Sequence, residues 1–185
     1  MRKVLFLLGQ LTDEDVEWIG RVGQRVQVPA SEVLIDEGRH TPLLYILLAG
    51  RAEVAVSGMG KVASMEVGDV FGEMSFIDAM PPSATVRTET PSTVLAVDKA
   101  ELSRHIAEDP TFGCRFYRAL AIFLSDRLRA ASRHQRSSAE SGSVNLHGDE
   151  ALEDELDGNV LDTVSQAGER FDRLMMSLLG ADARR

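Results

Sequence analysis

The hydrophobic positions of this chain change their period twice, from helix-like to strand-like and back. Residues 11–22 begin with Thr12 or Asp13 as a helix cap, and acidic residues fill the first turns, where the helix dipole favours them. The apolar positions of this stretch are Leu11, Val16 and Ile19. The spacing predicts a short amphipathic helix over residues 11–22.

Residues 25–97 show strand-like alternation or short apolar runs that are separated by glycine. The segments are 25–28, 33–35, 44–48, 52–56, 62–67, 85–88 and 93–97. The glycines at the breaks are Gly38, Gly50, Gly60 and Gly68, and they fit turns that need a positive φ or tight packing. Many short strands at this close spacing predict an all-β sandwich or barrel.

Helical periodicity returns after residue 98. We expect one short helix over 99–106 and a longer one over 111–131, with Pro110 at a favourable first-turn position. The long helix carries two neighbouring apolar stripes, one of Phe112, Phe116, Leu120 and Phe123, the other of Tyr117, Ala121, Leu124, Leu128 and Ala131. The second stripe either packs on another surface or widens a single buried face, and both interpretations stay open.

The last fifty residues read as a linker and a tail. Residues 135–149 are polar and contain Ser and Gly, which predicts a linker. Residues 150–185 have helical periodicity and predict an amphipathic tail that is broken near Gly158. Because one side of this tail is apolar, we expect it to dock on the domain, on a second copy of the chain or on another protein. The domain itself is then residues 1–134, including its long helix.

Composition and charge exclude several function classes. The chain has 185 residues and a net charge of −9, so general binding to nucleic acid is disfavoured. Cys114 is the single cysteine, and the four histidines lack metal-ligand spacing, so we expect no disulfide framework and no metal site. No nucleophile–base motif or Walker loop is present, and no run of apolar residues reaches membrane-spanning length. These observations predict a cytoplasmic, non-enzymatic protein without catalytic residues.

Five motifs in a fixed order resemble those of the cyclic nucleotide-binding domain family. They are residues 35–38 (IDEG), 44–47 (LYIL), 50–54 (GRAEV), 68–73 (GDVFGE) and 81–86 (PPSATV). The resemblance covers roughly residues 5–132. It implies a mainly β fold with flanking helices, in which an eight-stranded jelly-roll β-barrel is followed by a long C-terminal helix.

The same resemblance implies a phosphate-binding cassette over residues 71–86. Gly72 would let the backbone approach a ligand, and Glu73 would accept a hydrogen bond from a ribose 2′-hydroxyl. The remaining residues that the resemblance implies at the ligand are Met74, Ser75, Ser83, Ala84, Thr85 and, for the base, Ser132. Of these, the backbone amides of Ser75 and of Ser83 or Ala84 would donate to the phosphate. The ligand would be a cyclic nucleotide, cAMP or cGMP, or a cyclic dinucleotide.

Two residues depart from the family pattern. Pro82 stands where the family has an arginine that holds the phosphate, and Ala131 lacks the first of two hydroxyls at the base. A charge-assisted contact contributes about 1.5–3 kcal/mol, so losing it weakens binding roughly ten- to a few hundredfold. Arg87 is the nearest cation along the chain, but strand alternation does not clearly aim it inward.

Three functions remain in competition. The first is a regulatory sensor in which ligand or partner binding rearranges the helices, and the second is a degenerate domain that serves as a dimerisation or protein-interaction platform. The third is a transcriptional regulator acting through a partner, because residues 149–157 are acidic where a DNA-binding domain would follow, and we expect no direct DNA or membrane binding. We expect a homodimer through helix 111–131 or the tail 150–179, or a protein partner for the tail.

Overall fold

The computed structural model describes residues 9–140, 168–171, 173, 174 and 176. Two helices, α2 (Asp13–Val22) and α4 (Lys99–Glu108), flank a β-roll that is followed by the long helix α5 (Pro110–Glu140). The strands are β1 (Gln24–Val28), β2 (Val33–Ile35), β3 (Leu43–Ala49), β4 (Ala52–Val56), β5 (Gly60–Met65), β6 (Val70–Phe71), β7 (Thr85–Thr88) and β8 (Ser92–Asp98). A short helix, α3 (Met74–Ile77), lies between β6 and β7.

The eight strands form two four-stranded antiparallel sheets. Their orders are β1-β8-β3-β6 and β2-β7-β4-β5, and the longest pairing, between β3 and β8, joins strands that are far apart in sequence. The predicted jelly roll and its flanking helices are therefore confirmed. The eight strands stay in two sheets, so the barrel of this jelly roll is not closed.

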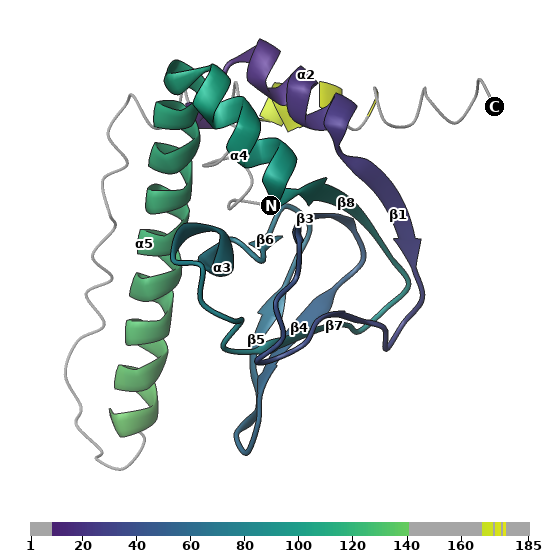
Figure 1. The fold of residues 1–185 in the computed structure, drawn as a ribbon. Helices are drawn as coiled ribbons and strands as arrows, with labels where there is room; N and C mark the ends of the chain where they lie inside the picture. Colours follow the sequence, from purple (N-terminus) through teal and green to yellow (C-terminus); the bar gives the residue numbers. More distant parts are fainter. Residues whose placement is uncertain (1–8, 141–167, 172, 175, 177–185) are drawn as a thin grey trace.

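Two apolar clusters fill the domain. One lies between the sheets and includes Leu47, Met65, Phe71 and Val94. The other lies where α2, α4 and α5 pack on the outer side of β3 and β8, and it contains Ile46, Leu95, Phe112 and Phe123. Figure 1 shows these three helices gathered on one side of the roll. Strand alternation produces this division, since successive side chains of β3 point into the two clusters in turn.

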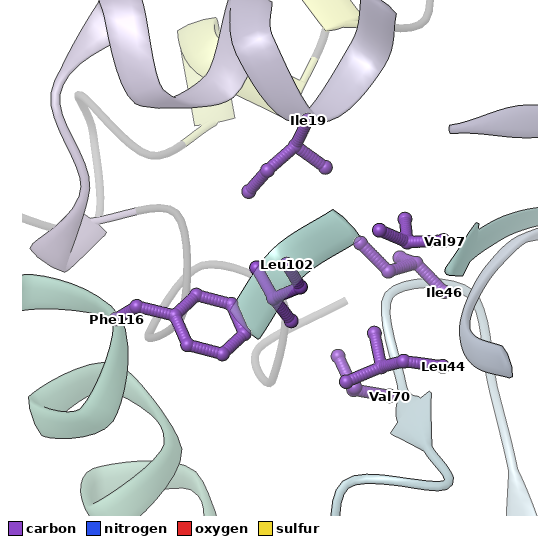
Figure 2. A pocket seen from close by; sticks show the side chains of 7 residues that line it. All are labelled: Ile19, Leu44, Ile46, Val70, Val97, Leu102 and Phe116. Atoms are coloured by element: carbon purple, nitrogen blue, oxygen red, sulfur yellow. The ribbon is translucent and has the colours of Figure 1, made fainter. Parts of the chain in front are cut away.

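A small pocket remains within the helix-side cluster. Its lining is apolar throughout: Ile19, Leu44, Ile46, Val70, Val97, Leu102 and Phe116. Figure 2 shows these side chains converging from α2, β3, β6, β8, α4 and α5. No polar group lines it, so a phosphate or a ribose would have no hydrogen-bond partner there, and the ligand cassette is elsewhere.

Helix α2 starts as the sequence predicts and is joined to α5 by a buried ion pair. Thr12 and Asp15 form a capping box, in which the Thr12 amide donates to Asp15 Oδ2 at 2.7 Å. The same carboxylate accepts two hydrogen bonds from Arg115 of α5, at 2.7 Å and 2.8 Å. Asp15 of the predicted acidic first turn thus also binds α5, a contact that the sequence pattern does not reveal.

Helix α5 is longer than the sequence predicts. The expected end was near Ala131, and a linker was expected from residue 135, but the helix continues to Glu140. Residues 132–140 contain no Gly or Pro, so no residue there ends the helix, and the first glycine follows at Gly142. The long helix as a whole is confirmed, and its exposed residues include Tyr117 and Leu128.

The described part of the tail is helical and docks on α2 of the same chain. Arg170 donates to Asp13 at 2.7 Å, and Arg173 lies 3.0 Å from the same carboxylate. Leu174 is buried, and its side chain lies against Gly20, where an added Cβ would be 2.8 Å from Leu174 Cδ1. The other residues of the expected tail, 150–167, 172, 175 and 177–185, lie outside the described residues. No helix of the described part is long and apolar enough to cross a membrane.

The Asp15–Arg115 pair predicts an acid-sensitive contribution to stability. Burial raises the pKa of Asp15, but hydrogen bonds from Arg115 and Thr12 outweigh it and hold that pKa below its ordinary value of 3.8. The pair therefore stabilises the fold above pH 3.8, and this contribution is lost as the pH falls through the lowered pKa of the folded state.

We expect Asp15→Asn to lower the free energy of unfolding at pH 7 by about 1–3 kcal/mol, because a charged hydrogen-bond acceptor is lost. Urea unfolding between pH 2.5 and pH 7 should also show a shallower acid dependence for the variant. The control is Glu14→Gln, an exposed acid in the same turn. Equal acid dependence in wild type and Asp15→Asn would contradict the assignment.

Candidate functional site

The cassette connects β6 to β7 and contains α3. Gly72 follows β6 with a φ of 87°, in the region that favours glycine. A Cβ at this position would lie 2.9 Å from the backbone oxygen of Leu43 on β3. The sequence therefore needs glycine here for a close backbone approach, although the approaching group in the structure is a neighbouring strand.

Glu73 is buried and joined to α5. Only 2% of the residue is exposed, and Arg127 Nη1 donates to Glu73 Oε1 at 2.6 Å. The guanidinium carbon of Arg127 lies 5.5 Å from the ring centroid of Phe123, one turn earlier on α5. The carboxylate that the family resemblance assigns to a ribose is thus held by the long helix.

Burial dominates the electrostatics of Glu73. It raises the pKa of the carboxyl, and the positive charges of Arg127 and Lys99 oppose this rise without cancelling it. The Arg127 side chain is 28% exposed while that of Glu73 is 2% exposed, so the acid is the deeper member of the pair. Such a pair is costly to break from one side, because the remaining charge stays buried without a partner.

Ser75 links α3 to the first residue of α4. Its hydroxyl lies 3.3 Å from the Gly72 carbonyl and 2.8 Å from Lys99 Nζ, which donates to it. Lys99 Nζ also donates to the Thr41 carbonyl at 3.0 Å. The cassette is therefore in polar contact with α4 through Lys99 and with α5 through Arg127.

The second half of the cassette is held by the β2–β3 connection. The Pro82 carbonyl accepts from the Gly38 amide at 2.8 Å, and the Thr85 hydroxyl accepts from the Glu37 amide at 3.2 Å. Ser83 is exposed and Ala84 is half-buried. Pro82 thus fixes this loop through its carbonyl group and supplies no cation.

The structure brings some of the expected ligand residues together and leaves others at the surface. Gly72, Glu73 and Ser75 form one connected group. Met74 is 50% exposed, and Ser132 is exposed on α5. The side chain of Ala131 lies outside the described residues. Arg87 is exposed on β7, where it is in register with Glu53 of β4.

Sequence reasoning missed both cations of the site. Arg127 had a signal, because it continues the stripe of Phe116, Leu120 and Phe123 at a spacing of four. An arginine on a buried stripe requires an anion inside the fold. Lys99 had no such signal, since its partners come from the Thr41 carbonyl and from Ser75, which are distant in sequence. No cluster of His, Cys, Asp or Glu in the described part could hold a metal ion.

A family comparison covers the segment that contains the cassette. Residues 25–109 match the family described as "Cyclic nucleotide-binding domain". The resemblance to this family that the five motifs predict is therefore confirmed for residues 25–109. The match contains the cassette and most of the β-roll, and it ends just before α5, so the Arg127 contact is made by a segment outside it.

Curated relatives match over part of their length. The Pycsar effector protein XpPycTIR of Xanthomonas perforans is 33% identical over 115 residues, which are 62% of this chain and 38% of that protein. The cAMP-dependent protein kinase regulatory subunit of Emericella nidulans is 38% identical over 66 residues, which are 35% of this chain and 16% of that protein. The chain therefore spans well under half the length of these relatives.

Solved structures share the fold. A cyclic nucleotide-binding domain from Methylobacillus flagellatus superimposes with a TM-score of 0.65 at 22% identity and covers 79% of this chain and 84% of that chain. A putative cyclic nucleotide-binding protein from Geobacter metallireducens gives a TM-score of 0.58 at 25% identity and covers 64% and 88%. The jelly-roll assignment thus rests on both topology and superposition.

The Glu73–Arg127 pair predicts a stability loss that grows with pH. Because the folded-state pKa of Glu73 is raised, deprotonation costs stability as the pH rises from the ordinary value of 4.5 through the folded-state pKa. Arg127→Met removes a positive charge that opposes the rise in the pKa of Glu73. The substitution must therefore cost more folding stability when Glu73 is ionised.

We expect Arg127→Met to lower the free energy of unfolding by about 3–5 kcal/mol at pH 8 and by less at pH 5, measured by urea unfolding. Arg129→Met is the matched control, because Arg129 is exposed on the same helix. The double variant with Glu73→Gln should regain most of the loss at pH 8. A pH-independent cost would show that the arginine acts through packing alone.

Proposed function

We propose that this chain is a non-enzymatic regulatory module in which the cassette binds a cyclic mononucleotide, cAMP or cGMP, and α5 responds. The observation that carries the proposal is the contact between Glu73 of the cassette and Arg127 of α5. The sequence similarity to a cAMP-dependent kinase regulatory subunit supports the ligand class. A cytoplasmic location is part of the same proposal.

The coupling follows from competition for one carboxylate. Arg127 binds Oε1 of Glu73, and the ribose 2′-hydroxyl of a ligand would bind the same group. A ligand shifts a conformational equilibrium only through different affinities for the two states. A ligand that contacts the Glu73 carboxylate would supply such a difference, because it would replace Arg127 as the partner of Glu73 and so change the contact that holds α5.

A second candidate function is a domain that binds no nucleotide and serves as an interaction platform. Two observations favour it: Glu73 is already neutralised by Arg127, and Pro82 places no cation in the loop. In this role, the exposed apolar residues of α5, Tyr117 at 45% and Leu128 at 69%, would form a homodimer contact.

Calorimetry on wild type and Pro82→Arg separates these functions. We expect wild type to bind cAMP or cGMP weakly, and Pro82→Arg to bind roughly ten- to a few hundredfold more tightly, because a charge-assisted phosphate contact is restored. Glu73→Gln should weaken binding in both backgrounds. A cyclic dinucleotide is the comparison ligand. Absence of binding by both wild type and Pro82→Arg would reject the sensor and leave the platform.

The dimer contact has a separate test. We expect Leu128→Glu to shift the mass measured by light scattering from dimer to monomer, because a charge is placed within the apolar contact. Arg129→Glu, at the adjacent exposed position, is the control for a change of charge on this helix. A wild-type mass that stays monomeric at high protein concentration would reject the contact.

A further inference from the structure

The cassette keeps a positive charge although its loop has lost the family arginine. Glu73 is the buried anion, and the positive charges that lower its pKa are those of Arg127 and Lys99. Arg127 is paired with Glu73 at 2.6 Å. One negative and two positive charges leave this group with a net charge of +1, and Lys99 carries the surplus.

Lys99 is a half-buried cation without a carboxylate partner in the described part of the chain. Its ammonium group has three protons, and its two acceptors in the described part of the chain, the Thr41 carbonyl and the Ser75 hydroxyl, are both neutral. Burial lowers the pKa of Lys99, and the negative charge of Glu73 opposes this effect. The third proton therefore has no acceptor in the described part of the chain, and an anion is the acceptor that the surplus charge favours.

The position of Lys99 places this charge at the cassette. Lys99 Nζ lies 2.8 Å from Ser75 Oγ, and the family resemblance assigns the Ser75 amide to the ligand phosphate. The hydroxyl and amide of one serine are about 3 Å apart, so the ammonium lies within roughly 6 Å of that amide. A phosphate oxygen that accepts from the amide would be within the range of direct or strongly favourable charge interaction.

We propose that Lys99, at the start of α4, supplies the cation that Pro82 removes from the cassette loop, and that it binds the anionic phosphate of the ligand. This inference rests on the proposed function, since it concerns the ligand of the same site. The lysine acts as a compact point charge, so it gives weaker orientation than a bidentate arginine does. It also connects the ligand to α4, which leads directly into α5.

The test measures cAMP binding by calorimetry for wild type, Lys99→Met and Lys99→Arg, each at 0.05 M and 0.5 M salt. We expect Lys99→Met to raise the Kd at low salt by about ten- to a hundredfold and to make the Kd less dependent on salt, because a charge interaction is lost. Lys99→Arg should stay within about threefold of wild type. Lys61→Met is the control, because Lys61 lies on β5 and is paired with Glu89, away from the cassette contacts of Lys99.

The same series in the Pro82→Arg background separates this inference from the proposed function. If either background binds cAMP and Lys99→Met leaves both the Kd and its salt dependence unchanged, the lysine is not the phosphate cation. A weaker Kd with unchanged salt dependence also overturns the inference, because it shows a scaffolding role. If neither background binds, the proposed function fails and takes the inference with it. Lys99→Gln replaces Lys99→Met if the melting temperature shows that the latter is unfolded.

Discussion

Two buried carboxylates hold α5 against the domain, and the rest of the site depends on them. Asp15 of α2 binds Arg115, and Glu73 of the cassette binds Arg127, about three helical turns further along α5. Breaking either pair leaves a charge in an apolar environment, which is far more costly than losing an exposed ion pair. The long helix is thus fixed at two separate points, one in the helical layer and one in the ligand cassette.

The cassette has polar contacts with three neighbouring segments of the chain. Arg127 contacts it from α5, Lys99 from the start of α4, and the Gly38 amide from the β2–β3 connection. Ring contacts between Phe76 of α3 and Phe116 and Tyr117 of α5 add an apolar connection. A change at Glu73 or Ser75 therefore acts on α4 and α5 through groups that are already in contact.

The cassette lies beside positively charged side chains although Pro82 stands where the family has an arginine. Pro82 cannot donate or carry charge, yet its carbonyl still fixes the loop to Gly38. Lys99 and Arg127 together exceed the charge of Glu73, so the environment remains suited to an anion. In the proposed ligand site, the positive charge comes from α4 and α5 instead of the cassette loop, so it depends on how these helices pack.

Much of the fold was determined by the sequence alone, because it follows from local rules. Local patterns predicted the helices and the strands. They are the Thr12 cap, the glycine-separated strands and the stripe of Phe112, Phe116 and Phe123. The cassette residues Gly72, Glu73 and Ser75 were also identifiable, since their motif is contiguous. Only the tertiary structure decided that the strands form two sheets, that α5 runs to Glu140, and that Arg170, Arg173 and Leu174 dock on α2. It also decided which cations reach the cassette. Lys99 and Arg127 meet Ser75 and Glu73 only when helices from distant parts of the chain pack on the roll, and no local pattern specifies the partner of a buried charge.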